Sequence, residues 1–148
     1  MKELYEIGFV FRGFVLVNHI FKELPVQKEH GINKDLRGAF ISGINAFTET
    51  AFQKSSLEYL ESGNILFIFK MEEIQSGDNN IKESLILYGL VDKSKKKSDK
   101  LVNKFFERVD PILQLFIQKF NGANFSELNQ FEQFEKSMID FLIKKPQE

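Results

Sequence analysis

Residues that commonly carry catalytic or metal chemistry are scarce in this sequence. Its only histidines are His19, inside a run of apolar residues, and His30, in a polar stretch, and there is no cysteine. A metal site needs several such ligands together, and a serine nucleophile needs a neighbouring base, so the sequence predicts neither. Glycine-rich phosphate-binding motifs are absent, and the sequence NKD at 33–35 has no phosphate loop beside it. We therefore predict a protein that is not an enzyme and that uses no metal or cofactor.

One dense basic cluster lies between residues 92 and 100, in the sequence DKSKKKSDK. Its lysines lie at the start of a predicted helix, and each would add about 1 kcal/mol of attraction near an anionic membrane. The simplest interpretation is a solvated turn, and the functional alternative is a contact with anionic lipid headgroups or an acidic protein surface. The lysines concerned are Lys93, Lys95, Lys96, Lys97 and Lys100.

The composition of the 148-residue chain is that of one globular domain, spanning 1–148, with 43% hydrophobic and 28% charged residues. A net charge of −1 gives no general attraction to nucleic acid. The apolar N-terminal run is interrupted by Glu6, Arg12 and Asn18, which excludes a membrane span. We expect a soluble, cytoplasmic protein whose 17 phenylalanines mainly fill its core.

Two runs rich in β-branched and aromatic residues, Leu4–Phe11 and Phe14–Phe21, open the chain. Arg12 and Gly13 separate them, and the glycine suits the positive φ of a tight turn, so the pattern predicts a β-hairpin. Both runs are apolar on both faces, which indicates a sheet that is covered on both sides.

The remaining pattern predicts three more strands and then helices. The strands are expected at 57–60, 64–71 and 84–91, with the charged stretch 72–80 as a loop. From Lys95 the apolar residues recur at helical spacing, and Pro111 is expected to kink or split this helix near Asp110. Residues 121–124 read as a helix stop, and Ser126 is a candidate cap for the last helix.

The stretch 35–52 reads as a helix although it contains two glycines. We expect Gly43 to lie within its buried stripe, where a missing side chain lets the helix approach the sheet. Gly38 falls nearly opposite, beside large residues off the core face, so this surface is a candidate for binding another chain. The stripe consists of Leu36, Phe40, Ile44, Phe47 and Ala51.

The predicted partner interface combines this helix with the short strand that follows it. Its strand would lie at the edge of the sheet, where unpaired backbone groups can bind a partner strand. A plainer interpretation is that the apolar residues off the core face tuck under neighbouring loops. The candidate residues are Arg37, Gly38, Ile41, Thr48, Phe52, Leu57 and Tyr59.

The element order is strand-strand-helix-strand-strand-strand-helix-helix. It predicts an α+β fold in which a five-stranded antiparallel sheet carries one helix on one face and two on the other. This order resembles the longin domain of trafficking proteins, over roughly residues 4–142. The segments that carry the resemblance are YEIGFVFRGFVLVNHIF, DLRGAFISGINAFTETAF, LEYLESGNILFIFK, LILYGLVD, KLVNKFFERVDPILQLF and FEQFEKSMIDFL.

The longin resemblance implies a protein-interaction module in a membrane-trafficking, tethering or small-GTPase regulatory assembly. The implied partners are another longin- or roadblock-type subunit, a small GTPase or a second copy of the chain, with peripheral contact to an anionic membrane. No SNARE heptad segment or membrane anchor precedes Glu148, so we expect no membrane-fusion activity. The alternative is a profilin- or PAS-like sensor that holds a small molecule between sheet and helix.

Overall fold

The structure, a computed structural model, describes residues 1–24, 41, 43 and 58–144. Five strands form one sheet in the order β2-β1-β5-β4-β3, and every neighbouring pair is antiparallel. The predicted α+β class and antiparallel sheet are therefore confirmed. The elements are β1 (Leu4–Phe11), β2 (Phe14–Ile20), β3 (Tyr59–Ser62), β4 (Ile65–Gln75), β5 (Lys82–Asp92), α2 (Ser98–Phe120), the 3₁₀ helix η1 (Leu128–Phe131) and α3 (Glu132–Ile143).

The N-terminal hairpin agrees with the sequence prediction. Strand β1 has the predicted bounds, and β2 ends one residue earlier than expected, at Ile20. Arg12 and Gly13 have φ values of 51° and 81°, so both central residues of the turn adopt the left-handed conformation that a two-residue hairpin turn favours. Every residue of β1 is buried, as expected for a strand covered on both sides.

The second hairpin is longer than the sequence indicated. Strand β4 continues through the charged stretch that was predicted as a loop and ends at Gln75, because Ile74 is fully buried and pairs with Glu83 on β5. The predicted strand 57–60 is shifted to Tyr59–Ser62, so that the turn into β4 contains Gly63 and Asn64. These errors arose where charged residues lie on strands that are only half buried.

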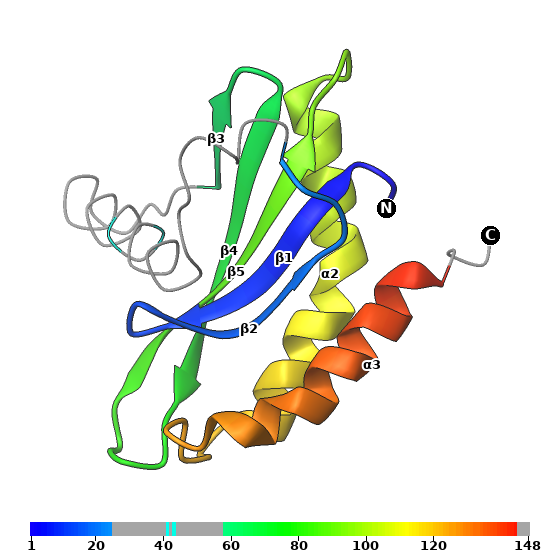
Figure 1. The fold of residues 1–148 in the computed structure, drawn as a ribbon. Helices are drawn as coiled ribbons and strands as arrows, with labels where there is room; N and C mark the ends of the chain where they lie inside the picture. Colours follow the sequence, from blue (N-terminus) through cyan, green and yellow to red (C-terminus); the bar gives the residue numbers. More distant parts are fainter. Residues whose placement is uncertain (25–40, 42, 44–57, 145–148) are drawn as a thin grey trace.

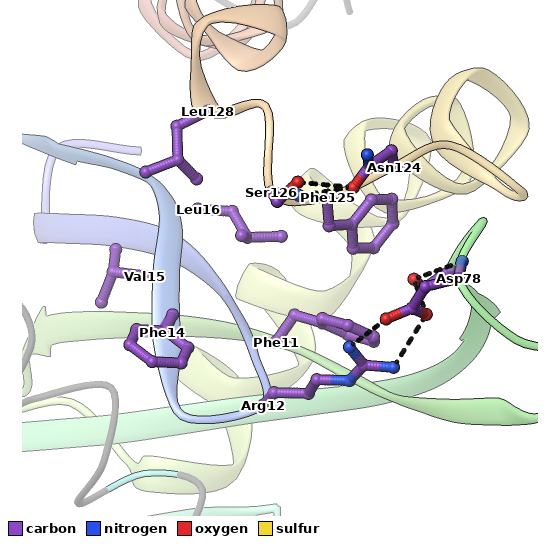
Figure 2. A pocket seen from close by; sticks show the side chains of 11 residues that line it. Phe11, Arg12, Phe14, Val15, Leu16, Asp78, Asn124, Phe125, Ser126 and Leu128 are labelled. Carbon is purple, nitrogen blue, oxygen red and sulfur yellow. Dashed lines mark hydrogen bonds and ion pairs between the residues drawn. The ribbon is translucent and has the colours of Figure 1, made fainter.

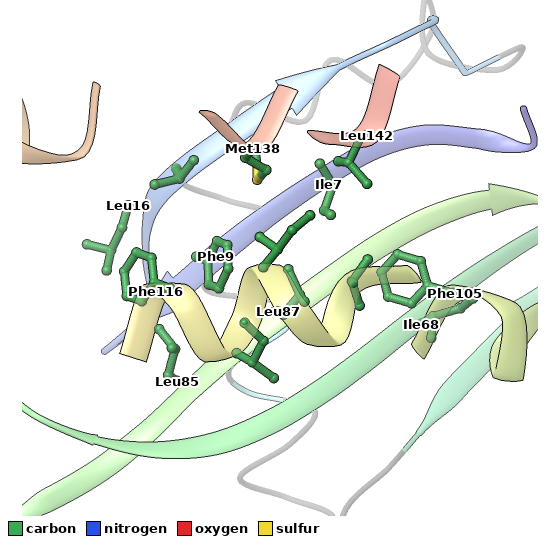
Figure 3. Packing of buried hydrophobic residues seen from close by; sticks show 14 of the residues in the cluster. Ile7, Phe9, Leu16, Ile68, Leu85, Leu87, Phe105, Phe116, Met138 and Leu142 are labelled. Carbon is green, nitrogen blue, oxygen red and sulfur yellow. The ribbon is translucent and has the colours of Figure 1, made fainter. Parts of the chain in front are cut away.

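Helices α2 and α3 lie on the same face of the sheet (Figure 1). Aromatic rings fill the space between them and the strands, as predicted from the phenylalanine content. Phe116 of α2 stacks on Phe9 of β1 with ring centroids 4.4 Å apart and meets Phe134 of α3 edge-on at 5.1 Å. Figure 3 shows Phe9 and Phe116 within this cluster, with Leu85 and Leu87 of β5 beside them.

A close approach of helix to sheet occurs at Gly89 of β5. A Cβ atom at this position would lie 2.4 Å from Cε2 of Phe105 on α2, so a side chain there would displace the phenylalanine ring. The sequence analysis assigned such an approach to Gly43. That assignment is wrong, because Gly43 is exposed and a Cβ atom there would meet no atom of another described element within 4 Å.

The opposite face of the sheet carries a second apolar cluster. Ile41 belongs to this cluster and is only 1% exposed, which corrects the expectation that it points away from the core. Ile41 and Gly43 are both helical and are two positions apart, which places them about 200° apart around the helix axis. Burial of Ile41 therefore directs Gly43 outward. The buried members of the cluster are Val10, Val15, Ile41, Phe69, Ile86 and Tyr88.

Two expectations about the C-terminal helices are also corrected. The split expected near Asp110 does not occur, because α2 continues through Pro111 as one helix. Pro111 lies on the exposed side, where water can hydrogen-bond the carbonyl of Glu107 that proline leaves without a donor. Ser126 does not cap the last helix. It donates instead to Oδ1 of Asn124 at 2.7 Å, and the chain enters α3 through η1.

Candidate functional site

Three chain connections meet at the end of the sheet where β4 runs into β5. They are the β1–β2 turn at Arg12 and Gly13, the β4–β5 turn at 76–81 and the α2–η1 connection at 121–127. The backbone N–H of Gly77 donates to the carbonyl of Ala123 at 2.7 Å. The N–H of Gly122 donates to the carbonyl of Gln75 at 2.6 Å. These backbone bonds fix two of the three connections relative to each other.

Arg12 holds the third connection in place. Its guanidinium donates to both carboxylate oxygens of Asp78, at 2.9 and 3.1 Å, and its Nε donates to Glu83 at 2.8 Å. A left-handed conformation costs an ordinary side chain about 1 kcal/mol or more, so the φ of 51° at Arg12 needs compensation. The ion pairs with Asp78 in the β4–β5 turn and with Glu83 on β5 favour this conformation.

The two carboxylates keep their charge over a wide pH range. The hydrogen bonds from Arg12, and then that from Ser76, lower the pKa of Asp78 to about 2. The pKa of Glu83 is also lowered, chiefly by Arg12. Since two carboxylates face one guanidinium, this triad carries one net negative charge.

A groove of about 560 Å³ lies between these connections, and we call it the loop-end groove. Its walls are mostly apolar, and Figure 2 shows Arg12 and Asp78 together at one side, with Leu128 across the groove. Phe14 is 64% exposed and Leu128 is 57% exposed, which is unusual for such large apolar side chains. The lining residues are Phe11, Arg12, Phe14, Val15, Leu16, Ser76, Asp78, Asn124, Phe125, Ser126 and Leu128.

The loop-end groove is better suited to binding than to proton transfer. Its acidic side chain, Asp78, has a pKa far below neutrality and is already engaged by Arg12, which makes it a weak base. Sequence reasoning missed this site because Arg12 and Asp78 are 66 positions apart. The one local signal was an arginine at a turn position that favours glycine, asparagine or aspartate.

The predicted helix-and-strand interface is only partly within the described residues. Ile41 is buried against the sheet and therefore offers no surface to a partner, as reported above. Tyr59 is half-buried on β3 and packs against the core beneath α2. The residues Arg37, Gly38, Thr48, Phe52 and Leu57 lie outside the described residues.

Strand β3 is at the edge of the sheet, as predicted. The N–H of Phe69 donates to the carbonyl of Glu58 at 2.8 Å, and Tyr59 is opposite Ile68. Bonded and non-bonded pairs alternate in an antiparallel ladder, so Leu60 bonds to β4. It follows that the backbone groups of Tyr59 and Glu61 point away from β4.

The lysine turn, residues 93–100, joins β5 to α2 near this edge. Lys93 pairs with Glu61 at 2.9 Å, and Lys96 pairs with Glu3, a carboxylate only 6% exposed. The predicted cluster is thus split, since two of its members are neutralised, one by Glu61 on β3 and the other by Glu3 just before β1. Three members are exposed and form no ion pair with another described residue, namely Lys95, Lys97 and Lys100.

No protein-family model matches the sequence, and no curated protein is significantly similar to it. Among the helices within the described part of the chain, none combines the length and apolar character needed to cross a membrane. Within residues 1–24, 41, 43 and 58–144, no three His, Asp or Glu side chains are grouped to hold a metal ion.

Proposed function

We propose that this chain is a non-enzymatic, longin-like interaction module that binds a protein partner through the edge strand β3. It would serve as a subunit of a membrane-trafficking, tethering or small-GTPase regulatory assembly. The order of the described elements supports the longin-like assignment, with an N-terminal hairpin, a further three antiparallel strands and two C-terminal helices on one face.

The observation that carries the proposal is the direction of the backbone groups of Tyr59 and Glu61. An edge strand with outward N–H and C=O groups can add a strand from another chain, and the new main-chain bonds provide affinity for many sequences. The partner is another longin- or roadblock-type subunit, a small GTPase or a second copy of this chain.

A small-molecule sensor of the profilin or PAS type is the competing function. Such a sensor needs space between sheet and helix, whereas Phe9, Phe116 and Phe134 pack in direct ring contact beneath α2 and α3. That filled interior counts against a ligand on this face. It favours a protein whose function lies on its surface.

The edge-strand proposal is tested with two substitutions at one position. Glu61→Pro removes the outward N–H, and Glu61→Ala is its matched control because both variants lose the side-chain contacts to Lys93 and Ser98. Proline is tolerated on an edge strand, so both variants should fold with similar circular dichroism spectra.

The binding readouts are self-association by size-exclusion chromatography with light scattering and capture of partners from native extract, identified by mass spectrometry. We expect Glu61→Ala to retain association and Glu61→Pro to lose it. Equal association by the two folded variants would exclude strand addition at β3.

A further inference from the structure

We propose that the loop-end groove is a second binding site, which accepts a large apolar side chain flanked by a basic residue in a peptide segment of a partner protein. The site is independent of β3, because Ser76 at the groove and Ile68 opposite Tyr59 are eight residues apart on β4 and the turn after it. That separation corresponds to about 27 Å along an extended chain.

The walls of the groove are fixed before any ligand arrives. Backbone bonds join the β4–β5 turn to the α2–η1 connection, and Arg12 joins the β1–β2 turn to Asp78 and Glu83. A third bond, from the N–H of Gln75 to Oδ1 of Asn121 at 2.8 Å, strengthens the same junction. Binding to such a site loses little conformational entropy in the protein.

The apolar part of the ligand is specified by the lining. Phe14 and Leu128 approach the groove from β2 and from η1, and both leave most of their side chains exposed. Buried Phe11 and Phe125, with ring centroids 4.8 Å apart, also line it. A volume of about 560 Å³ is within the range of about 300 to 1,000 Å³ typical of ligand pockets.

The charge beside the groove selects a cation. Arg12 has five N–H donors, and four of them are already donated to Asp78 and Glu83. An anionic ligand would therefore find one free donor beside two carboxylates. A lysine or arginine next to the apolar anchor would instead lie beside Asp78, which lines the groove, with Glu83 behind Arg12 adding the net negative charge. Lys82 does not offset this charge, since side chains alternate along β5 and it lies on the other face from Glu83.

The probes are two tetrapeptides, acetyl-Gly-Phe-Lys-Gly-amide and acetyl-Gly-Phe-Glu-Gly-amide, added to the isotopically labelled full chain and followed by NMR chemical shifts. We expect the lysine peptide to shift amide signals of residues 13–16 and 124–128. It should bind more tightly than the glutamate peptide by up to about fivefold, the upper end of the range for one exposed charge pair. Shifts at other residues, or equal binding of both peptides, would overturn the proposal.

Two substitutions separate the apolar and charged contributions. Leu128→Asp should abolish the shifts, whereas its control Ile143→Asp, at a side chain 65% exposed at the end of α3, should leave them unchanged. If Leu128→Asp fails to fold, Phe14→Ser takes its place. Glu83→Gln should remove most of the preference for the lysine peptide, a change of up to about fivefold, while preserving the contact sites.

The same NMR titration tests whether the groove instead binds an anionic acyl chain. Tighter binding of octanoate than of the lysine peptide would assign the groove to an anionic acyl chain and refute the peptide proposal. Glu61→Pro alters only the distant edge strand. If this variant loses partner association but still shows the peptide-induced shifts, the two sites act independently and the failure of one can be told from the failure of the other.

Discussion

At one end of the β4–β5 hairpin, backbone hydrogen bonds and the Arg12 ion pairs tie three connections together. At the other end, the edge strand β3 and the lysine turn are joined by side-chain contacts such as that of Glu61 with Lys93. The first arrangement fixes a concave surface. The second leaves a strand edge with outward backbone groups.

This contrast suggests two kinds of recognition in one small molecule. A preformed groove selects ligands by the shape and charge of their side chains, as the loop-end groove would. A strand edge binds mainly through the backbone and so accepts more sequences. Partners that engage both ends would gain avidity without new contacts.

The largest effect is expected in the core that supports both ends. Phe116→Ala removes the ring that contacts Phe9 and Phe134, and it should lower the free energy of unfolding by about 4 kcal/mol. The control is the adjacent Leu115→Ala, at a side chain 47% exposed, with an expected loss below about 1 kcal/mol. Urea denaturation measures both. Comparable losses would mean that the ring cluster is not the centre of the core.

The next largest effect is expected at the β3 end of the molecule, where Glu3 pairs with Lys96 of the lysine turn. Burial alone would raise the pKa of this carboxyl, but hydrogen bonds from Lys96 and Lys104 outweigh burial and lower the pKa to about 2. Glu3→Gln should therefore reduce the free energy of unfolding by about 2 kcal/mol at pH 7, since both lysines are partly exposed.

The pH dependence of this effect has a definite sign. A lowered pKa in the folded state stabilises the protein fully above the ordinary value of 4.5, and the contribution is lost as the pH falls towards 2. The difference in free energy of unfolding between wild type and Glu3→Gln, measured by urea denaturation, should therefore shrink as the pH is lowered from 4.5 towards 2. The exposed Glu107→Gln is the control, and a difference independent of pH would contradict the assignment.

Local patterns explain why some elements were predictable. The bounds of β1 follow from a run of apolar residues that ends at a turn pair, and the stripe of α2 follows from helical spacing. Each of these two signals is formed by residues that are close together in the sequence. The antiparallel sheet then follows from hairpins with short turns.

Long-range contacts explain what could not be predicted. Ile41 was placed off the core because the sequence 35–52, wound as a helix, has apolar residues on more than one side, and only packing on the sheet decides which side is buried. The pairs Arg12–Asp78 and Glu3–Lys96 join residues 66 and 93 positions apart. No spacing rule connects such residues, so the loop-end groove was missed.

A smaller effect tests the strain at the groove end. Arg12→Ala and Arg12→Asn both remove the ion pairs with Asp78 and Glu83, but asparagine adopts positive φ more readily than alanine. The alanine variant should therefore be less stable than the asparagine variant by about 1 kcal/mol in urea denaturation. Equal stabilities would mean that the left-handed turn carries no strain.

The smallest effect concerns the lysine turn, where membrane contact stays a prediction. Lys97 is exposed and has no ion pair with a described residue, whereas Lys96 is engaged by Glu3. Lys97→Gln should weaken the free energy of binding to vesicles that contain acidic lipid, measured by sedimentation, by at most about 1 kcal/mol. Lys96→Gln should weaken it less, because the Lys96 ammonium is bound to Glu3 and is therefore less available for direct headgroup contact. Equal binding to neutral and acidic vesicles by the unmodified chain would exclude a contact between these lysines and anionic headgroups.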